Sequence, residues 1–178
     1  MGEKRVGHSI VHASLRGSDD AKSCTLIITE GESAKSVAML GRTMLGQDKY
    51  GVLALWGKIR NARGHKVNTC EKAKCIQSCL GLDVEQKNPD RSSLKYGQIM
   101  IMTDQDHDGM HIKGLIINML HNFWPCLLKL KPPFISEFVT PILKVEHITL
   151  SEEKLFCSMS EYSMWQASAK DDLLTQWK

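Results

Sequence analysis

The chain has 178 residues, of which 42% are hydrophobic and 24% charged, and its net charge is 23 − 20 = +3. This composition excludes wholesale disorder, and the small positive charge permits nucleic-acid binding without requiring it. The longest apolar stretch, residues 112–130, is interrupted by polar side chains and a proline, so we predict no membrane span. Residues 1–20 are charged and lack an apolar core, so we expect no secretory signal.

The cysteines lack the spacing of a disulfide framework. Cys70, Cys75 and Cys79 are spaced like one face of a helix, and neither a second cysteine pair nor a His-x-x-x-His motif follows them. A structural zinc site would need a fourth ligand and tighter pairing. We therefore favour reduced, mostly buried thiols, which suit an intracellular protein, over a zinc site.

The first half of the chain predicts a strand, a turn and a helix after a polar start. Residues 1–23 are polar and aperiodic, and we expect a flexible lead-in. The apolar, β-branched run 24–29 is typical of a buried parallel strand. Residues 32–40 contain good helix formers and stop at Gly41.

The remaining elements follow the same alternation. We predict a strand over 50–56, a basic stretch over 60–74, a helix over 69–80 and a loop over 85–93. A buried strand over 98–103, a long amphipathic helix from Ile112 to Leu127, a last strand over 138–145 and a polar, helix-prone end over 160–178 follow. Strands that alternate with helices indicate an α/β fold with a mostly parallel sheet flanked by helices.

Acidic side chains follow two of the predicted strands at the point where each strand ends. Glu30 follows the first strand, and Asp104, Asp106 and Asp108 follow the strand over 98–103. Functional groups in open α/β sheets gather at the carboxyl ends of strands, so we expect these carboxylates to lie in one cleft. Their mutual repulsion would be relieved by a divalent cation, and oxygen ligands favour Mg2+, Mn2+ or Ca2+.

The aspartates are compatible with other interpretations. Aspartates after a strand also serve simply as helix caps and turn residues. Asp104-x-Asp106-x-Asp108-Gly109 matches the first half of an EF-hand loop, but Leu115 stands where that loop needs a glutamate, and a β-run precedes it. A phospho-receiver domain usually has an aspartate pair on its first strand, which here ends in Glu30-Gly31.

Several motifs in order resemble the Toprim domain of eukaryotic-type, type IIA DNA topoisomerases II. Residues 30–34 resemble its EGxSA segment, and 103–114 resemble its DxDxDG segment. Residues 48–52, 55–61 and 95–102 are similar to further segments of that family, so the resemblance covers about 24–145. Trp56 stands where the family usually has arginine, and Ala54 where it has proline, which puts DNA contact near Lys58 in question.

The resemblance implies a Rossmann-like Toprim fold over 24–145, with 146–178 as the start of a link to a winged-helix region. It implies an Mg2+ cofactor, which Mn2+ or Ca2+ could replace, held by Glu30, Asp104, Asp106 and Asp108. By the same carry-over, Glu30, Asp104 and Asp106 would be catalytic in transient double-strand DNA cleavage and religation. Residues at two segments would contact DNA: Lys58, Arg60, Asn61, His111 and Lys113.

The resemblance also implies partners. They are double-stranded DNA and the ATPase and winged-helix regions of an ATP-dependent topoisomerase. The resemblance further implies that this enzyme is a homodimer. It would be located in the nucleus or, alternatively, in a mitochondrion or other DNA-containing organelle. None of Tyr50, Tyr96 and Tyr162 has the context of the family's nucleophile, so we expect this chain alone to be inactive. The alternatives are another Toprim enzyme, such as a nuclease or primase, and a non-catalytic DNA-binding or regulatory module.

Overall fold

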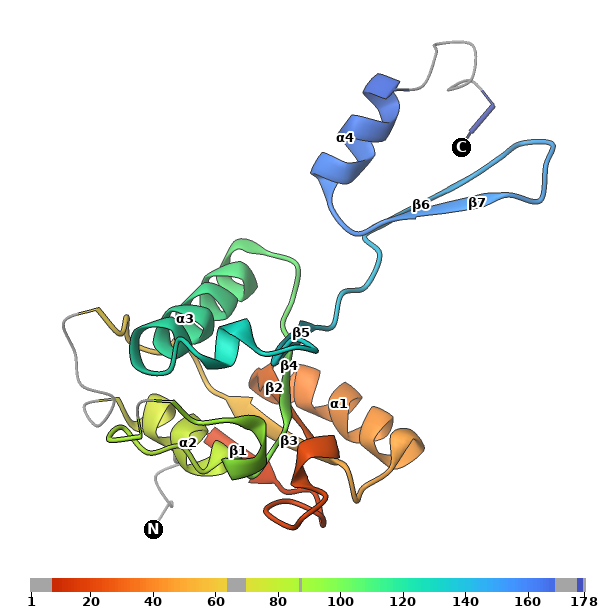
Figure 1. Cartoon of the computed structure of the whole chain (residues 1–178). Helices are drawn as coiled ribbons and strands as arrows, with labels where there is room; N and C mark the ends of the chain where they lie inside the picture. Colours follow the sequence, from red (N-terminus) through yellow and green to blue (C-terminus); the bar gives the residue numbers. More distant parts are fainter. Residues whose placement is uncertain (1–7, 64–69, 87, 169–175, 178) are drawn as a thin grey trace, which may run out of the picture. The chain divides into compact units, whose positions relative to one another are not determined.

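The computed structural model describes residues 8–63, 70–86, 88–168 and 176–177 (Figure 1). The chain divides into two compact units, Met1–Phe138 and Val139–Lys178. The sequence prediction placed a boundary seven residues later, after Val145. Each unit is described by itself.

A five-stranded sheet forms the centre of the first unit, with the strand order β1-β3-β2-β4-β5. The strands are β1 (His8–Val11), β2 (Thr25–Glu30), β3 (Tyr50–Leu55), β4 (Gln98–Met102) and β5 (Ile135–Glu137). β2 is parallel to both β3 and β4, β4 is parallel to β5, and only β1 pairs in the antiparallel sense. The predicted α/β fold with a mostly parallel sheet is confirmed.

Helices cover both faces of this sheet. Leu26 and Ile28 of β2 belong to the main core, which also contains buried residues of α2 (Glu71–Leu80) and α3 (His107–Phe123). Ile27, between them, belongs to a smaller cluster with Ala38 of α1 (Gly31–Leu45). Because side chains alternate along a strand, one run of apolar residues covers both faces, as the predicted buried strand requires.

The helix ends follow from local sequence. Asp106 directly precedes α3, and its side chain caps the first turn. Gly81 directly follows α2 and adopts a left-handed conformation (φ 74°) that favours glycine. The described part of this unit also contains the short 3-10 helices η1 (Ala21–Ser23), η3 (Arg91–Ser93) and η4 (Leu127–Lys129).

Residues 8–23 are part of the folded unit, which differs from the predicted flexible lead-in. β1 pairs with β3 along its length, and the backbone N–H of Ala13 donates a hydrogen bond to the buried Tyr96 hydroxyl at 3.0 Å. β1 is ordered because it pairs with the edge of β3, whose backbone N–H and C=O groups on that side would otherwise be unpaired. β1 is short and only partly buried, so its hydrophobic pattern is weak. Residues 1–7 lie outside the described residues.

The second unit contains a two-stranded antiparallel sheet, β6 (Leu143–Glu146) and β7 (Glu153–Phe156), and helix α4 (Met159–Ser168). Phe156 packs against the rings of Tyr162 and Trp165 at centroid distances of 5.3 and 5.2 Å. The predicted last strand over 138–145 overlaps a strand of the structure, β6, only at 143–145. The sheet instead ends with β5, and β6 pairs in a separate sheet beyond Pro141.

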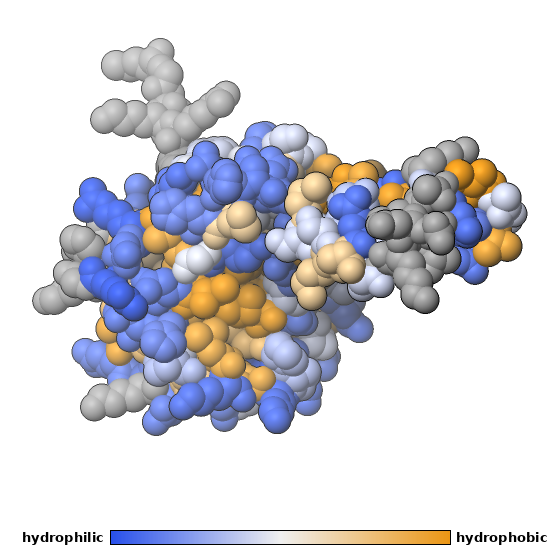
Figure 2. Space-filling view, turned by 90° about the horizontal axis from the view of Figure 1, so that it is seen from above, coloured by the Kyte–Doolittle hydropathy of each residue, from blue (hydrophilic) through white to orange (hydrophobic). Residues whose placement is uncertain are grey.

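The surface combines hydrophilic and hydrophobic residues (Figure 2). α1 alone exposes four large apolar side chains: Val37, Leu40, Met44 and Leu45. No helix in the described part of the chain is both long and apolar enough to cross a membrane.

Candidate metal centre

The sheet register brings the acidic segments to one edge. Thr29 of β2 lies opposite Met102 of β4 in the parallel ladder. Glu30 is the last residue of β2, and Asp104 follows β4 after a single intervening residue. The carboxyl ends of two neighbouring strands therefore present Glu30 and the aspartate loop at the same edge, which is where open α/β sheets place their functional groups.

The aspartate loop is fixed by the start of α3. The Asp106 carboxylate accepts a hydrogen bond from the backbone N–H of Gly109 at 2.7 Å, and it therefore caps the helix. Gly109 is buried, and a Cβ there would overlap the carbonyl oxygen of Asp104. The helix packs directly on the acidic loop, and only glycine leaves room for that approach.

A lysine reaches the same edge from the third strand. Lys58 follows β3, which is parallel to β2, and its Nζ lies 2.7 Å from the Asp108 carboxylate. The hydrogen bond and charge of Lys58 lower the pKa of Asp108 below its ordinary value. Both side chains are exposed, so this pair contributes little to stability. Its importance is positional, since it places one cation among the carboxylates.

Glu30 responds in the opposite direction. Its pKa is raised, first by burial and then by the negative charges of Asp106, Asp108 and Asp104, while Lys58 opposes the shift. Glu30 therefore shares one electrostatic environment with all three aspartates. A carboxylate with a raised pKa at the end of a buried strand holds a proton more readily than an ordinary glutamate, which suits it to proton transfer.

The carboxylates at this edge suit a divalent cation by their chemistry rather than by their present spacing. In the part of the chain that the structure describes, no three acidic, histidine or cysteine side chains are already gathered closely enough to hold a metal. The chemistry nevertheless fits, because the donors are carboxylate oxygens, and because repulsion by the aspartates adds to burial in raising the pKa of Glu30. A cation bound at Glu30 and the aspartates would remove that repulsion, and it would compete with Lys58 for Asp108.

The predicted DNA-contacting residues fall into two groups. Lys58, Arg60, Asn61 and His111 are exposed, whereas Lys113 is partly buried and forms an ion pair with Glu137. His65 and Lys66 of the predicted basic stretch lie outside the described residues. Sequence reasoning missed Glu137, which ends β5 next to β4. Like Glu30, Glu137 is an acidic residue at the end of a strand. It was missed because the strand was predicted over 138–145, after Glu137 rather than before it.

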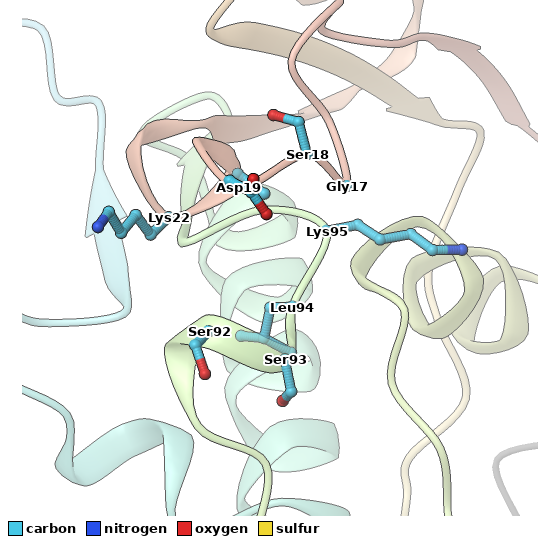
Figure 3. A pocket seen from close by; sticks show the side chains of 9 residues that line it. Gly17, Ser18, Asp19, Lys22, Ser92, Ser93, Leu94 and Lys95 are labelled. Atoms are coloured by element: carbon cyan, nitrogen blue, oxygen red, sulfur yellow. The ribbon is translucent and has the colours of Figure 1, made fainter.

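A cavity of about 470 Å³ lies elsewhere, beside η1 and η3 (Figure 3). Its lining includes Lys22 and Lys95, whose side chains point away from each other in Figure 3, so their charges do not converge on one ligand. Both residues precede the strands that end at the acidic edge, β2 and β4. This cavity therefore lies toward the amino ends of the strands and is not part of the carboxylate site.

Comparison with models of known protein families shows to which family the chain belongs. The family model described as "Toprim domain" matches residues 25–137, which include Glu30, the aspartate loop and every strand of the sheet except β1. The chain belongs to the Toprim domain family. The resemblance read from the motifs is thus confirmed.

Individual relatives of this Toprim chain are DNA topoisomerases. It is 48% identical over 170 residues to DNA topoisomerase 2 of Plasmodium falciparum, covering 93% of this chain and 12% of that protein. It is 47% identical over 161 residues to DNA topoisomerase 2 of Arabidopsis thaliana, covering 89% of this chain and 11% of that protein. The Toprim chain thus spans about a tenth of the length of these relatives.

A solved structure agrees with the sequence comparisons. The crystal structure of the Plasmodium falciparum topoisomerase II DNA-binding, cleavage and re-ligation domain matches with a TM-score of 0.79 and 44% identity. The match covers 100% of this Toprim chain and 24% of that structure.

Proposed function

We propose that the chain is the Mg2+-binding Toprim module of an ATP-dependent type II DNA topoisomerase. It would assist transient double-strand cleavage and religation by a tyrosine from a winged-helix region of the same enzyme. The observation that supports the proposal most is the sheet register, which brings the carboxyl ends of β2 and β4, and with them Glu30 and the aspartate loop, to one edge. Its relatives, named as DNA topoisomerases, support the reaction class.

Each carboxylate would have a distinct role. Glu30, Asp104 and Asp106 would hold the metal, which would polarise phosphoryl oxygens when bound. Glu30, with its raised pKa, would give a proton to the 3′-oxygen of the broken strand and take it back at religation. Asp108, which is held by Lys58, would be a weaker ligand that can exchange the lysine for the metal.

The DNA would approach the same edge. Lys58 and Arg60 are exposed cations at the end of β3, and His111 is exposed in the first part of α3, next to the aspartate loop. Lys113, paired with Glu137, would be available only when that pair opens. Contacts of this kind reach phosphates, so they would position duplex DNA without reading its sequence. The enzyme would be a homodimer in the nucleus or in another DNA-containing compartment.

A graft tests this proposal. This chain would replace the aligned segment of Plasmodium falciparum DNA topoisomerase 2, and cleavage of supercoiled plasmid would be measured with and without Mg2+. We expect Mg2+-dependent, tyrosine-linked cleavage that Glu30→Gln abolishes. Glu32→Gln, which changes a carboxylate that pairs with Lys35, should retain cleavage. A graft that folds and binds DNA but never cleaves it would contradict the proposal and favour a non-catalytic module.

The isolated chain is a second test. With Mg2+ it should neither cleave nor relax plasmid, because Tyr50 and Tyr96 lie at or before the amino ends of β3 and β4, far along the strands from the acidic edge. Tyr162 lies on α4 of the second unit. Nicking without a covalent protein–DNA link would favour the nuclease alternative.

A further inference from the structure

Cysteine and histidine side chains line a pocket formed by residues of β1 and α2, away from the carboxylates. A pocket of about 320 Å³ is lined there by two cysteines of α2 and two histidines at β1. These residues are Cys75, Cys79, His8 and His12, and the rest of the lining comes from Ile10, Glu71, Lys74 and Ser78. The proposed topoisomerase function uses none of them.

The two cysteines have the spacing of zinc ligands. They are four residues apart on α2, and their sulfur atoms lie 3.9 Å apart as free thiols. Two sulfurs bound to one tetrahedral Zn2+ at about 2.3 Å each lie about 3.8 Å from one another. The sulfur–sulfur distance of this thiol pair therefore equals, to about 0.1 Å, the distance that two zinc-bound sulfurs would have.

Nitrogen donors line the same pocket. Nδ1 of His8 is buried and has no hydrogen-bond partner within the described ranges, which is a costly state for a polar atom. Nδ1 of His12 interacts with the Tyr96 hydroxyl at 3.2 Å, which fixes the ring and leaves Nε2 as the ligating nitrogen. Metal-bound histidines are commonly oriented through their second nitrogen in this way.

The four donors line one pocket without being gathered around one point. No three of these donors stand within metal-binding distance of one another in the described residues, so a histidine ring must turn to complete the site.

We propose that Cys75, Cys79, His8 and His12 form a binding site for one thiophilic divalent cation, Zn2+ foremost. Such a site would fasten the edge strand β1 to α2, since its ligands come from both elements. Sulfur and nitrogen donors select Zn2+ or Cd2+ over the Mg2+ expected at the carboxylates. The sequence interpretation disfavoured zinc because it sought the missing ligands after the cysteines, whereas the histidines precede them by more than sixty residues.

The full chain, reduced and freed of metal, would be titrated with Cd2+ while sulfur-to-metal charge-transfer absorbance is recorded, and with Zn2+ against a chromophoric chelator. We expect one equivalent to bind, with affinity falling at least about tenfold in Cys75→Ser and in Cys79→Ser and less steeply in His12→Gln. Cys126→Ser, which changes a partly buried cysteine outside the pocket, should bind like the wild type. Circular dichroism would establish that each variant is folded.

Three results would contradict the proposed zinc site. Absence of binding by the wild type, or equal binding by wild type and Cys75→Ser, would overturn the site. Equal loss in Cys126→Ser would show unspecific thiol chemistry and would overturn it as well. Glu30→Gln should leave Zn2+ binding unchanged, so the result does not depend on the proposed topoisomerase function.

Discussion

Two glycines of α3 offer a matched test of how the helix is packed against the acidic loop. A Cβ on Gly109 would overlap the Asp104 carbonyl oxygen and would lie 3.1 Å from Cβ of Thr103, whereas a Cβ on Gly114 would meet nothing within 4 Å. Because the overlap is with a backbone oxygen, Gly109→Ala forces the loop or the helix to shift by about 1 Å. Forced overpacking of this kind typically costs about 1–3 kcal/mol.

The same substitution at Gly114 should have the opposite sign. Alanine is favoured over glycine inside a helix by about 0.5–1 kcal/mol, so Gly114→Ala should stabilise the chain. The two variants share this helix gain and differ by the strain of about 1–3 kcal/mol at Gly109. That difference amounts to about 2–12 °C between their melting temperatures, at about 2–4 °C per kcal/mol for a chain of this size. Thermal unfolding followed by circular dichroism measures it, and equal melting temperatures would refute the packing argument.

Three further predictions concern the hydroxyl of Tyr96, the proton of Glu30 and the charge of Lys58. Tyr96→Phe should cost about 1–3 kcal/mol in urea unfolding, because the Ala13 N–H loses its acceptor, whereas Tyr162→Phe, whose hydroxyl bond is exposed, should cost much less. Because the pKa of Glu30 is raised, the folded chain binds its proton more tightly than the unfolded chain, so stability falls as pH rises from the unfolded pKa through the folded pKa. Glu30→Gln should therefore raise metal-free stability at neutral pH and flatten that slope. An unchanged slope above the ordinary pKa of a glutamate would contradict the shift. Lys58→Gln should tighten Mg2+ binding in calorimetry, because it frees the Asp108 carboxylate. It should also weaken the binding of duplex DNA in fluorescence anisotropy and reduce the salt dependence of that binding. Weaker Mg2+ binding or unchanged DNA binding would contradict this prediction.

The strands that build the acidic edge were predictable because their residues carry local signals. The run 24–29 is apolar and β-branched, and the run 98–103 resembles it, so both were found within a residue or two of β2 and β4. β1 and β5 were missed for the same physical reason. Each is a short edge strand of partly buried residues, and its place depends on pairing with a neighbour distant in the sequence.

The candidate site was predictable as a set of residues and not as a set of contacts. The position of Glu30 and the aspartates at strand ends follows from the parallel order of the sheet. The ion pairs of Lys58 with Asp108 and of Lys113 with Glu137 span 50 and 24 residues, and no spacing rule foretells them. These ion pairs form because the ends of β3 and β5 lie beside the start of α3, and that arrangement exists only in the folded sheet.

Calorimetric titration with Mg2+ tests the central claim most directly. The wild type would be compared with the double variant Asp104→Asn/Asp106→Asn and with Asp20→Asn, which removes a carboxylate beside η1 near the amino ends of the strands. We predict that the wild type and Asp20→Asn bind Mg2+ alike and that the double variant does not bind it. Identical titrations for all three proteins would show that the carboxylates at the ends of β2 and β4 do not form a metal site.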